Sequence, residues 1–214
     1  MALSRSRLHE LPEDAVILTE DEALKYQWNI INEWKTPKDV WALKNTSSII
    51  GACSALTGIY VNQHYRSRLK VSSYGKFSSY LPIVVIPALF SILTHKLFVQ
   101  RSLVLDPMGE CPLCVQLRAA TLQAGLGVVY PTVLAPMAAF MFATRHFTYR
   151  LPIITEDPRA VFQLWVKFTK PITPMLGALA VGHSLVAMYL TYKSTEQSIQ
   201  CQLEMKKGEK QLEH

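Results

Sequence analysis

The sequence predicts an all-α integral membrane protein: a four-helix protein with an amphipathic N-terminal helix and a charged C-terminal tail. Three observations support this fold class. Half of the 214 residues are apolar and only 18% are charged, whereas about a quarter of the residues in a typical soluble domain are charged. The apolar residues are gathered in blocks that approach the length of about 20 residues needed to cross a bilayer. The basic residues lie mostly between these blocks and leave a net charge of +6, which is typical of loops at a membrane surface.

These patterns divide the chain into three parts. A polar N-terminal region occupies residues 1–44, a transmembrane domain residues 45–192, and the charged tail residues 193–214. Within the transmembrane domain we predict four spans, at residues 45–62, 77–94, 119–143 and 172–192. The lipid bilayer is therefore an expected partner. No nucleic acid is expected, because the chain has no basic stripe interleaved with aromatic residues.

The amphipathic helix is expected at residues 19–34. Thr19 followed by Glu22 is the pattern of a capping box, in which each side chain bonds the backbone of the other residue. A stripe of apolar side chains follows at helical spacing, namely Leu24, Trp28, Ile31 and Trp34. Two interpretations stay open: the stripe lies at the membrane interface, or it covers the core of this protein or of a partner subunit. Before this helix, acidic residues follow the first arginines so closely that we expect no cleavable leader.

The first span, 45–62, is uncharged but the least apolar of the four. Ser47, Gly51 and Ala55 recur in it at intervals of four residues, and small residues at that spacing let two helices approach closely in lipid. Ala120 and Ala124 form a second strip of this kind at the third span. We expect both strips to be helix-packing faces, and the first span to be packed among other helices.

The other three spans each carry a pair of prolines. Proline removes a backbone hydrogen bond, so we expect kinks in the second and third spans and close neighbours around them. The pairs are Pro82 with Pro87, Pro131 with Pro136, and Pro171 with Pro174 at the start of the fourth span.

The loops differ in charge. Residues 63–76 and 144–171 together hold nine Lys and Arg residues, whereas residues 95–118 hold three. The positive-inside rule therefore places the first and third loops on the negative side of the membrane, with both termini and the second loop opposite.

Cys111 and Cys114 are the one pair of residues with chemical promise. A CxxC is a redox dithiol, half of a metal site or a local disulfide, because two intervening residues bring both sulfurs to one side of a turn. Cys53 and Cys201 are too far apart in the sequence to complete a zinc site, so no metal is expected. The arrangement is similar to the bacterial disulfide-generating membrane proteins and the vitamin K epoxide reductases. Those four-helix enzymes use a quinone and a second cysteine pair, which this chain lacks.

His183 is the titratable side chain that falls well inside a predicted span. We expect it to be hydrogen-bonded within the helix bundle rather than to serve a proton relay, because no carboxylate or second histidine falls in the spans. His64, His95 and His146 are expected at span ends, facing the head groups. With no phosphate loop, nucleophile elbow or paired carboxylates, we expect no catalytic residues, no cofactor and no enzymatic activity.

From the second span onward, the order of features resembles the transmembrane protein 126 family. The likeness covers roughly residues 45–195. The residues that carry it are Ile86, Pro87, Phe98, Cys111, Cys114, Arg118, Gly127, Tyr130, Pro131, Leu134, Leu151, Pro152, Trp165, Thr169, Lys170 and Pro171. Residues 1–44 look unlike the vertebrate members of that family.

The resemblance implies a multi-pass protein of the mitochondrial inner membrane that assists assembly of respiratory complex I. Its implied partners are complex I membrane-arm subunits or assembly intermediates, and it implies no catalytic residues. Whether such a protein leaves the finished complex or stays as an accessory subunit is open. The alternative function is a membrane thiol-disulfide oxidoreductase that uses the CxxC and quinone.

Overall fold

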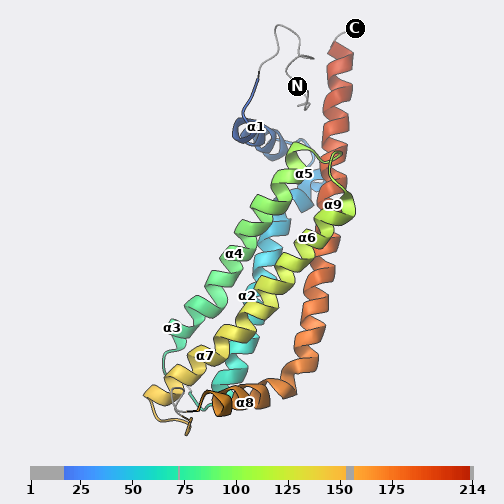
Figure 1. The fold of residues 1–214 in the computed structure, drawn as a ribbon. Helices are drawn as coiled ribbons and strands as arrows, with labels where there is room; N and C mark the ends of the chain where they lie inside the picture. Colours follow the sequence, from blue (N-terminus) through green and yellow to red (C-terminus); the bar gives the residue numbers. More distant parts are fainter. Residues whose placement is uncertain (1–16, 72, 153–156, 213–214) are drawn as a thin grey trace.

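A computed structural model describes residues 17–71, 73–152 and 157–212, without the side chains of residues 209, 210 and 212. The leader expectation concerns residues 1–16 and therefore lies outside the described residues. Regular secondary structure in the described ranges is entirely helical (Figure 1). The α-helices are α1 (Glu20–Asn32), α2 (Trp41–Arg68), α3 (Lys76–Tyr80), α4 (Ile86–His95), α5 (Arg101–Leu105), α6 (Pro112–Ala124), α7 (Tyr130–Arg145), α8 (Pro158–Thr169) and α9 (Thr173–Leu212).

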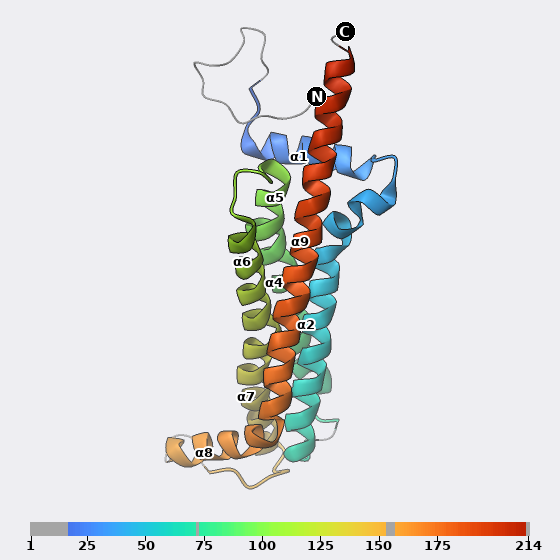
Figure 2. The same cartoon turned by 90° about the vertical axis from the view of Figure 1, so that its right-hand side faces the viewer.

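The helices build an elongated bundle of four rods. One rod is α2, the second runs through α3, α4 and α5, the third through α6 and α7, and the fourth is α9 (Figures 1 and 2). The short helices α1 and α8 lie across opposite ends of this bundle. The end of the bundle that bears α1 also bears α5 and the C-terminal turns of α9.

Three helical runs are long and apolar enough to cross a membrane: Lys76–Leu105, Pro112–Arg145 and Pro158–Gly208. The predicted first span falls within α2, which is not among them. α2 has the length but carries buried polar side chains along one face: Thr46, Ser47, Ser54, Thr57 and Asn62. It packs against α4, α7 and α9, so these polar groups face protein rather than lipid.

The prolines of the second and third rods coincide with changes of helix type. A π-helical turn at Leu81–Val85 contains Pro82 and ends just before Pro87. A second π-helical turn at Gly125–Val129 ends just before Pro131. In a π-turn each backbone hydrogen bond spans five residues instead of four, so the helix can continue past a proline, which has no N–H to donate. Both rods therefore stay helical through their proline pairs.

The small face of α2 packs closely on the second rod. A Cβ atom on Gly58 would lie 2.5 Å from the carbonyl oxygen of Ile83, and one on Gly51 would lie 2.5 Å from the side chain of Ile92. Ser47 is buried on the same face. The backbones therefore approach more closely than any larger residue would allow.

An apolar cluster under α1 shows which partner its stripe contacts. Leu24, Trp28 and Trp34 pack against buried residues from α1, α2, α5 and α9 and from the turn before α2, namely Ile31, Val40, Leu43, Val104 and Cys201. The capping box is formed, since the Thr19 backbone N–H donates to the Glu22 carboxylate at 2.9 Å and the Glu22 N–H donates to the Thr19 hydroxyl. The stripe of α1 therefore covers the protein's own core.

The α8 helix lies in a region that the sequence pattern left as a loop. The Asp157 side chain caps it by accepting from the Ala160 N–H at 3.0 Å, and Pro158 occupies the first turn. An Asp–Pro pair before apolar residues at helical spacing is the start signal that would have predicted α8.

We expect Gly58→Ala to destabilise the protein by about 1–3 kcal/mol, because its new methyl group meets the Ile83 carbonyl oxygen, which is held by the backbone. Thermal unfolding in detergent measures the effect. Gly182→Ala on α9 is the matched control, since its methyl group meets no atom within 4 Å, and it should leave the melting temperature unchanged or raise it. Equal melting temperatures for the two variants would contradict the close packing.

Candidate functional site

The side chains with chemical potential fall into two groups: a polar network inside the bundle and the CxxC at the start of α6. The network begins on α2, where Ser54 donates to the Ile50 carbonyl oxygen at 3.2 Å and lies 2.9 Å from the Ser91 hydroxyl of α4. Gln123 of α6 adds its amide nitrogen, 3.0 Å from the Ile50 oxygen and 3.1 Å from the Ser54 hydroxyl. This cluster of hydrogen bonds around Ser54 thus joins the first, second and third rods.

His183 connects the fourth rod to the same network. Its Nδ1 lies 2.9 Å from the Gln123 amide nitrogen and its Nε2 lies 2.8 Å from the Thr57 hydroxyl. The Gln123 amide nitrogen also faces the Ile50 carbonyl oxygen, which only accepts, so this atom is the NH2 group. His183 Nδ1 therefore accepts from Gln123, and the ring proton lies on Nε2 and is donated to Thr57. The structure thus places His183 as a neutral, hydrogen-bonded histidine inside the bundle.

Glycine makes room for this imidazole. A Cβ atom on Gly127 would lie 2.6 Å from His183 Nδ1. The π-turn Gly125–Val129 therefore presents bare backbone to the ring. No periodicity of the sequence signals this contact, because it joins residues that are 56 positions apart in the chain and belong to separate rods.

The expectation for His95 was wrong. Instead of facing head groups, His95 is 3% exposed and its Nδ1 lies 3.2 Å from the Ser47 hydroxyl of α2. The helical run of the second rod continues to Leu105, so the residue lies well inside the rod rather than at its end. His64 bonds the Phe168 carbonyl oxygen at 3.0 Å, and the exposed His146 stacks on Tyr74.

Further polar contacts hold the two ends of α2. At its N-terminus the side-chain amide oxygen Oε1 of Gln197, on α9, accepts from the backbone N–H groups of Ala42 and Leu43, at 2.8 and 3.3 Å. At its C-terminus the buried Arg66 donates to the Ser79 hydroxyl at 3.0 Å and to the Tyr74 carbonyl oxygen at 2.9 Å. The N-terminal end of α2 is therefore held by a side chain of α9. Its C-terminal end is held by bonds from Arg66 to α3 and to the loop that follows α2.

The strips of small residues are occupied within the bundle. Ser47 and Gly51 are buried against α4, whereas Ala55 is half-buried. On α6, which packs against α9, Ala120 is buried and Ala124 half-buried. These packing faces are thus used by the protein's own helices.

Cys111 and Cys114 lie at the start of α6. Cys111 is the residue before the first turn and Cys114 lies within it, and both are exposed free thiols. The thiol and backbone N–H of Cys114 donate to the Cys111 sulfur, which lowers the pKa of Cys111. The sequence left a disulfide, a thiol pair and a redox dithiol open. The free, exposed sulfurs allow reversible oxidation.

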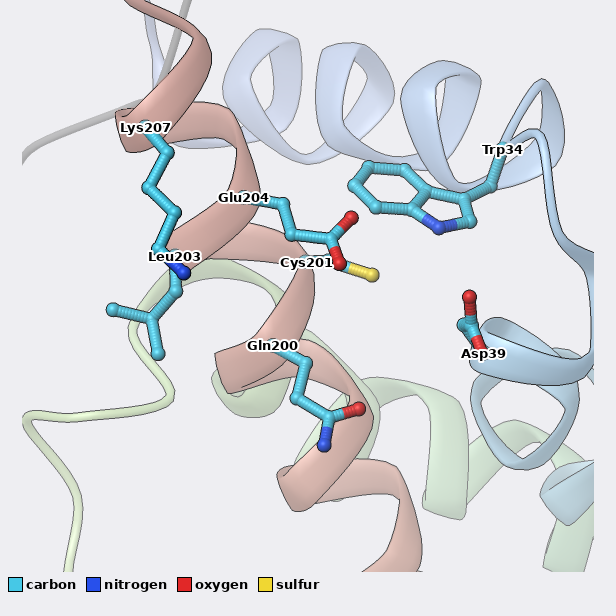
Figure 3. Close-up of a pocket in the computed structure, with 7 residues that line it drawn as sticks. All are labelled: Trp34, Asp39, Gln200, Cys201, Leu203, Glu204 and Lys207. Atoms are coloured by element: carbon cyan, nitrogen blue, oxygen red, sulfur yellow. The ribbon is translucent and has the colours of Figure 1, made fainter. Parts of the chain in front are cut away.

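The other two cysteines lie elsewhere. Cys53 is half-buried on α2, and the buried Cys201 lines a cavity of about 320 Å³ between α9 and the segment that follows α1. In Figure 3 the carboxylates of Asp39 and Glu204 and the Cys201 sulfur face one space beside the Trp34 indole. Across the described residues, no group of three His, Cys, Asp or Glu side chains is arranged to hold a metal ion.

Comparison with known proteins gives a consistent picture. The family model described as Transmembrane protein 126 matches residues 29–208. A Drosophila melanogaster protein named Transmembrane protein 126 is 53% identical over 213 residues, which covers 100% of this chain and 96% of that protein. Two mouse proteins are more distant. Complex I assembly factor TMEM126B, mitochondrial, is 33% identical over 104 residues, covering 49% of this chain and 44% of its own. Transmembrane protein 126A is 28% identical over 148 residues, covering 69% and 72%. No solved structure matches the chain.

Replacing Gln123 by Leu should destabilise the bundle by about 1–3 kcal/mol, because Ser54 and the His183 ring nitrogen lose their shared donor while staying buried. Unfolding by increasing mole fractions of dodecyl sulfate measures the change. The control is Gln116→Leu on the same helix, at a half-buried position outside the network. The network would contribute nothing to stability if the two variants unfolded together.

The Cys111 thiol should react with iodoacetamide at lower pH than an ordinary exposed thiol, because its lowered pKa leaves thiolate present there. Peptide mass spectrometry assigns the modified sulfur. Cys114→Ala removes the donated hydrogen bond and should move the midpoint upward, whereas Cys114→Ser keeps a donor and should move it less. An unchanged midpoint in the alanine variant would refute this cause of the low pKa.

Proposed function

Because the chain belongs to the transmembrane protein 126 family, we propose that it is a non-enzymatic, multi-pass protein of the mitochondrial inner membrane that assists assembly of respiratory complex I. The observation that carries the proposal is the family match over residues 29–208, together with the mouse relative whose name describes a mitochondrial complex I assembly factor. Three apolar helical runs support a membrane location. The interior supports a structural role, since its polar groups bond one another across the rods.

In this proposal α2 is the fourth span. It lies alongside α4 and α9 in both views of the bundle, so a bilayer that surrounds those helices also surrounds α2. Polar residues such as Thr46, Ser54 and Thr57 lower its mean hydropathy, but these three bond within the protein instead of meeting lipid. A helix of this composition is stable in a membrane only when its neighbours cover it.

The surface proposed to contact complex I membrane-arm subunits is the outer stripe of α2. Its exposed residues begin with the small Ser48 and Ala52 and continue with the larger Leu56, Ile59 and Tyr60 and with Gln63. The exposed residues in the middle of the second and third rods are large and apolar, namely Val85, Leu89, Phe90, Leu93, Val133 and Met137. Lipid suits large apolar side chains, whereas the small residues Ser48 and Ala52 on α2 suit a closely packed helix of another subunit.

This contact is compatible with a transient assembly factor and with a retained accessory subunit, because both need the same surface. The alternative function, a quinone-linked thiol-disulfide oxidoreductase, draws support from the exposed Cys111 thiol and its lowered pKa. It would need a second dithiol from a partner protein.

Depletion of the protein should reduce mature complex I on blue-native gels and leave the other respiratory complexes largely intact. Rescue by variants then tests the surface and the chemistry separately. Ala52→Trp should fail to rescue because the indole blocks a close helix contact, whereas Leu89→Trp, on the exposed face of α4, should rescue. The double variant Cys111→Ser with Cys114→Ser should also rescue.

Three results would contradict the proposal. Normal complex I after depletion would exclude the assembly role. Loss of rescue by the cysteine double variant would favour the oxidoreductase. Rescue by Ala52→Trp would move the partner contact away from the outer stripe of α2.

A further inference from the structure

The α8 helix carries three separate faces. One face packs into the bundle through Val161, Leu164 and Trp165, with Phe168 buried. A second face is apolar but exposed, with Phe162 58% and Val166 46% exposed. A third face is basic and lies beyond the second around the helix, formed by the exposed side chains of Arg159, Lys167 and Lys170. A helix that covers a core needs the first face and tolerates a charged outer face in water, but the exposed apolar face calls for another partner.

The orientation of these faces is fixed by contacts with α2. His64 bonds the Phe168 carbonyl oxygen at 3.0 Å, and the Tyr65 and Thr169 hydroxyls lie 2.7 Å apart. A short 3-10 turn, Lys170–Ile172, joins α8 to the first turn of α9. Because these contacts hold the inner face, the Phe162 face cannot turn into the bundle.

The position of α8 matches the surface of a bilayer. Both views show it crosswise at the foot of the bundle, where α7 ends and α9 begins (Figures 1 and 2). α7 and α9 belong to helical runs long and apolar enough to cross a membrane, the second of which also contains α8, and with both runs embedded their ends beside α8 would lie near the head groups. An amphipathic helix lying crosswise at that depth directs its exposed apolar face toward the acyl chains.

The charge of α8 selects the kind of lipid. From Pro158 to Lys170 the chain holds three cations and no acidic residue. The segment just before it holds Arg145 and Arg150 together with two acidic residues, Glu156 and Asp157, so residues 145–170 keep an excess of positive charge. By contrast, the first turn of α1, at the other end of the bundle, contains Glu20, Asp21 and Glu22. A surface with several cations attracts anionic head groups by about 1 kcal/mol for each Lys or Arg near the membrane.

A cavity at the corner between α8 and α9 offers a matching shape. Its volume is about 210 Å³ and its lining residues are Trp165, Val166, Thr169, Lys170 and Thr173. Apolar walls with one cation at the edge suit a lipid, whose phosphate meets the lysine while the glycerol and first methylene groups meet the indole.

We propose that α8 is an interfacial helix that binds anionic phospholipid head groups, with Phe162 and Val166 inserted at the acyl boundary and Arg159, Lys167 and Lys170 paired with lipid phosphates. The proposal goes beyond complex I assembly but rests on the membrane embedding proposed above. A protein groove would be the other occupant of such a face. Lipid is favoured because the face sits at the end of two apolar helical runs.

The test uses the full-length chain in vesicles of phosphatidylcholine with phosphatidylglycerol. All four tryptophans are replaced by phenylalanine, and a single reporter is introduced as Phe162→Trp on α8 or Phe90→Trp on the exposed face of α4. Brominated phosphatidylglycerol or brominated phosphatidylcholine, at equal mole fraction, then quenches the reporter fluorescence. Circular dichroism confirms that each variant is helical.

We expect the α8 reporter to be quenched about twofold more by the anionic brominated lipid, and the α4 reporter to be quenched equally by both. Combining Arg159→Gln, Lys167→Gln and Lys170→Gln should bring the α8 ratio to unity. Combining Lys96→Gln, Lys206→Gln and Lys207→Gln, at exposed positions outside α8, should leave it unchanged.

Equal quenching of the α8 reporter by both lipids would overturn the head-group selection. Quenching of the α4 reporter alone would overturn the lipid contact of α8 and point to a protein or to water, with the embedding intact. Quenching of neither reporter would overturn the embedding itself, and with it this proposal.

Discussion

The structure depends on the pairing of polar side chains along α2. Ser47, Ser54 and Thr57 are buried on the face of α2 that packs against three other helices, where no lipid group could bond them. Ser54 and Ser47 pair with Ser91 and His95 of α4, and Thr57 pairs with His183 of α9. Because these pairs join α2 to α4 and α9, and Gln123 joins α6 to the same network, the helices are correctly placed only together. A polar group left unpaired in such an interior costs about 1–3 kcal/mol, so the network favours one register of the four rods over the alternatives.

Close packing and polar pairing depend on each other in this bundle. The Gly51 and Gly58 positions bring the backbone of α2 against the second rod, which also brings Ser54 within 2.9 Å of Ser91. Gly127 in the π-turn of the third rod leaves the space that the His183 ring fills. In lipid, where burial of apolar surface does little to join helices, such contacts are the main source of association. The glycines and the hydroxyl groups of α2 therefore act together: the glycines let the neighbouring helix approach, and the hydroxyl groups form hydrogen bonds to it.

The sequence predicted the elements that have a local signal. The capping box of Thr19 and Glu22, the all-helical class and three apolar blocks each depend on residues close together in the chain. It failed where a signal was missed or is not local. The start of α8 at Asp157 and Pro158 is a local signal, but it was missed because the surrounding charged residues were read as a loop. The burial of His95 was not local, because it follows from the continuation of the second rod to Leu105 and from the approach of Ser47 on another helix.

The two ends of the bundle differ in a way that bears on function. At one end, the acidic first turn of α1 is tied to the α5 helix, since Arg101 contacts Glu20 at 3.2 Å and Asp21 at 3.0 Å. These acids are thus partly neutralised by the protein itself. At the other end, the cations of α8 have no acidic residue on their own helix. The acidic side chains of α1 are paired within the protein and need no outside partner. The exposed cations of α8 share one sign and attract anionic groups from outside. The basic end is therefore suited to hold the protein at a membrane surface, which leaves the exposed sides of the rods available to a membrane subunit.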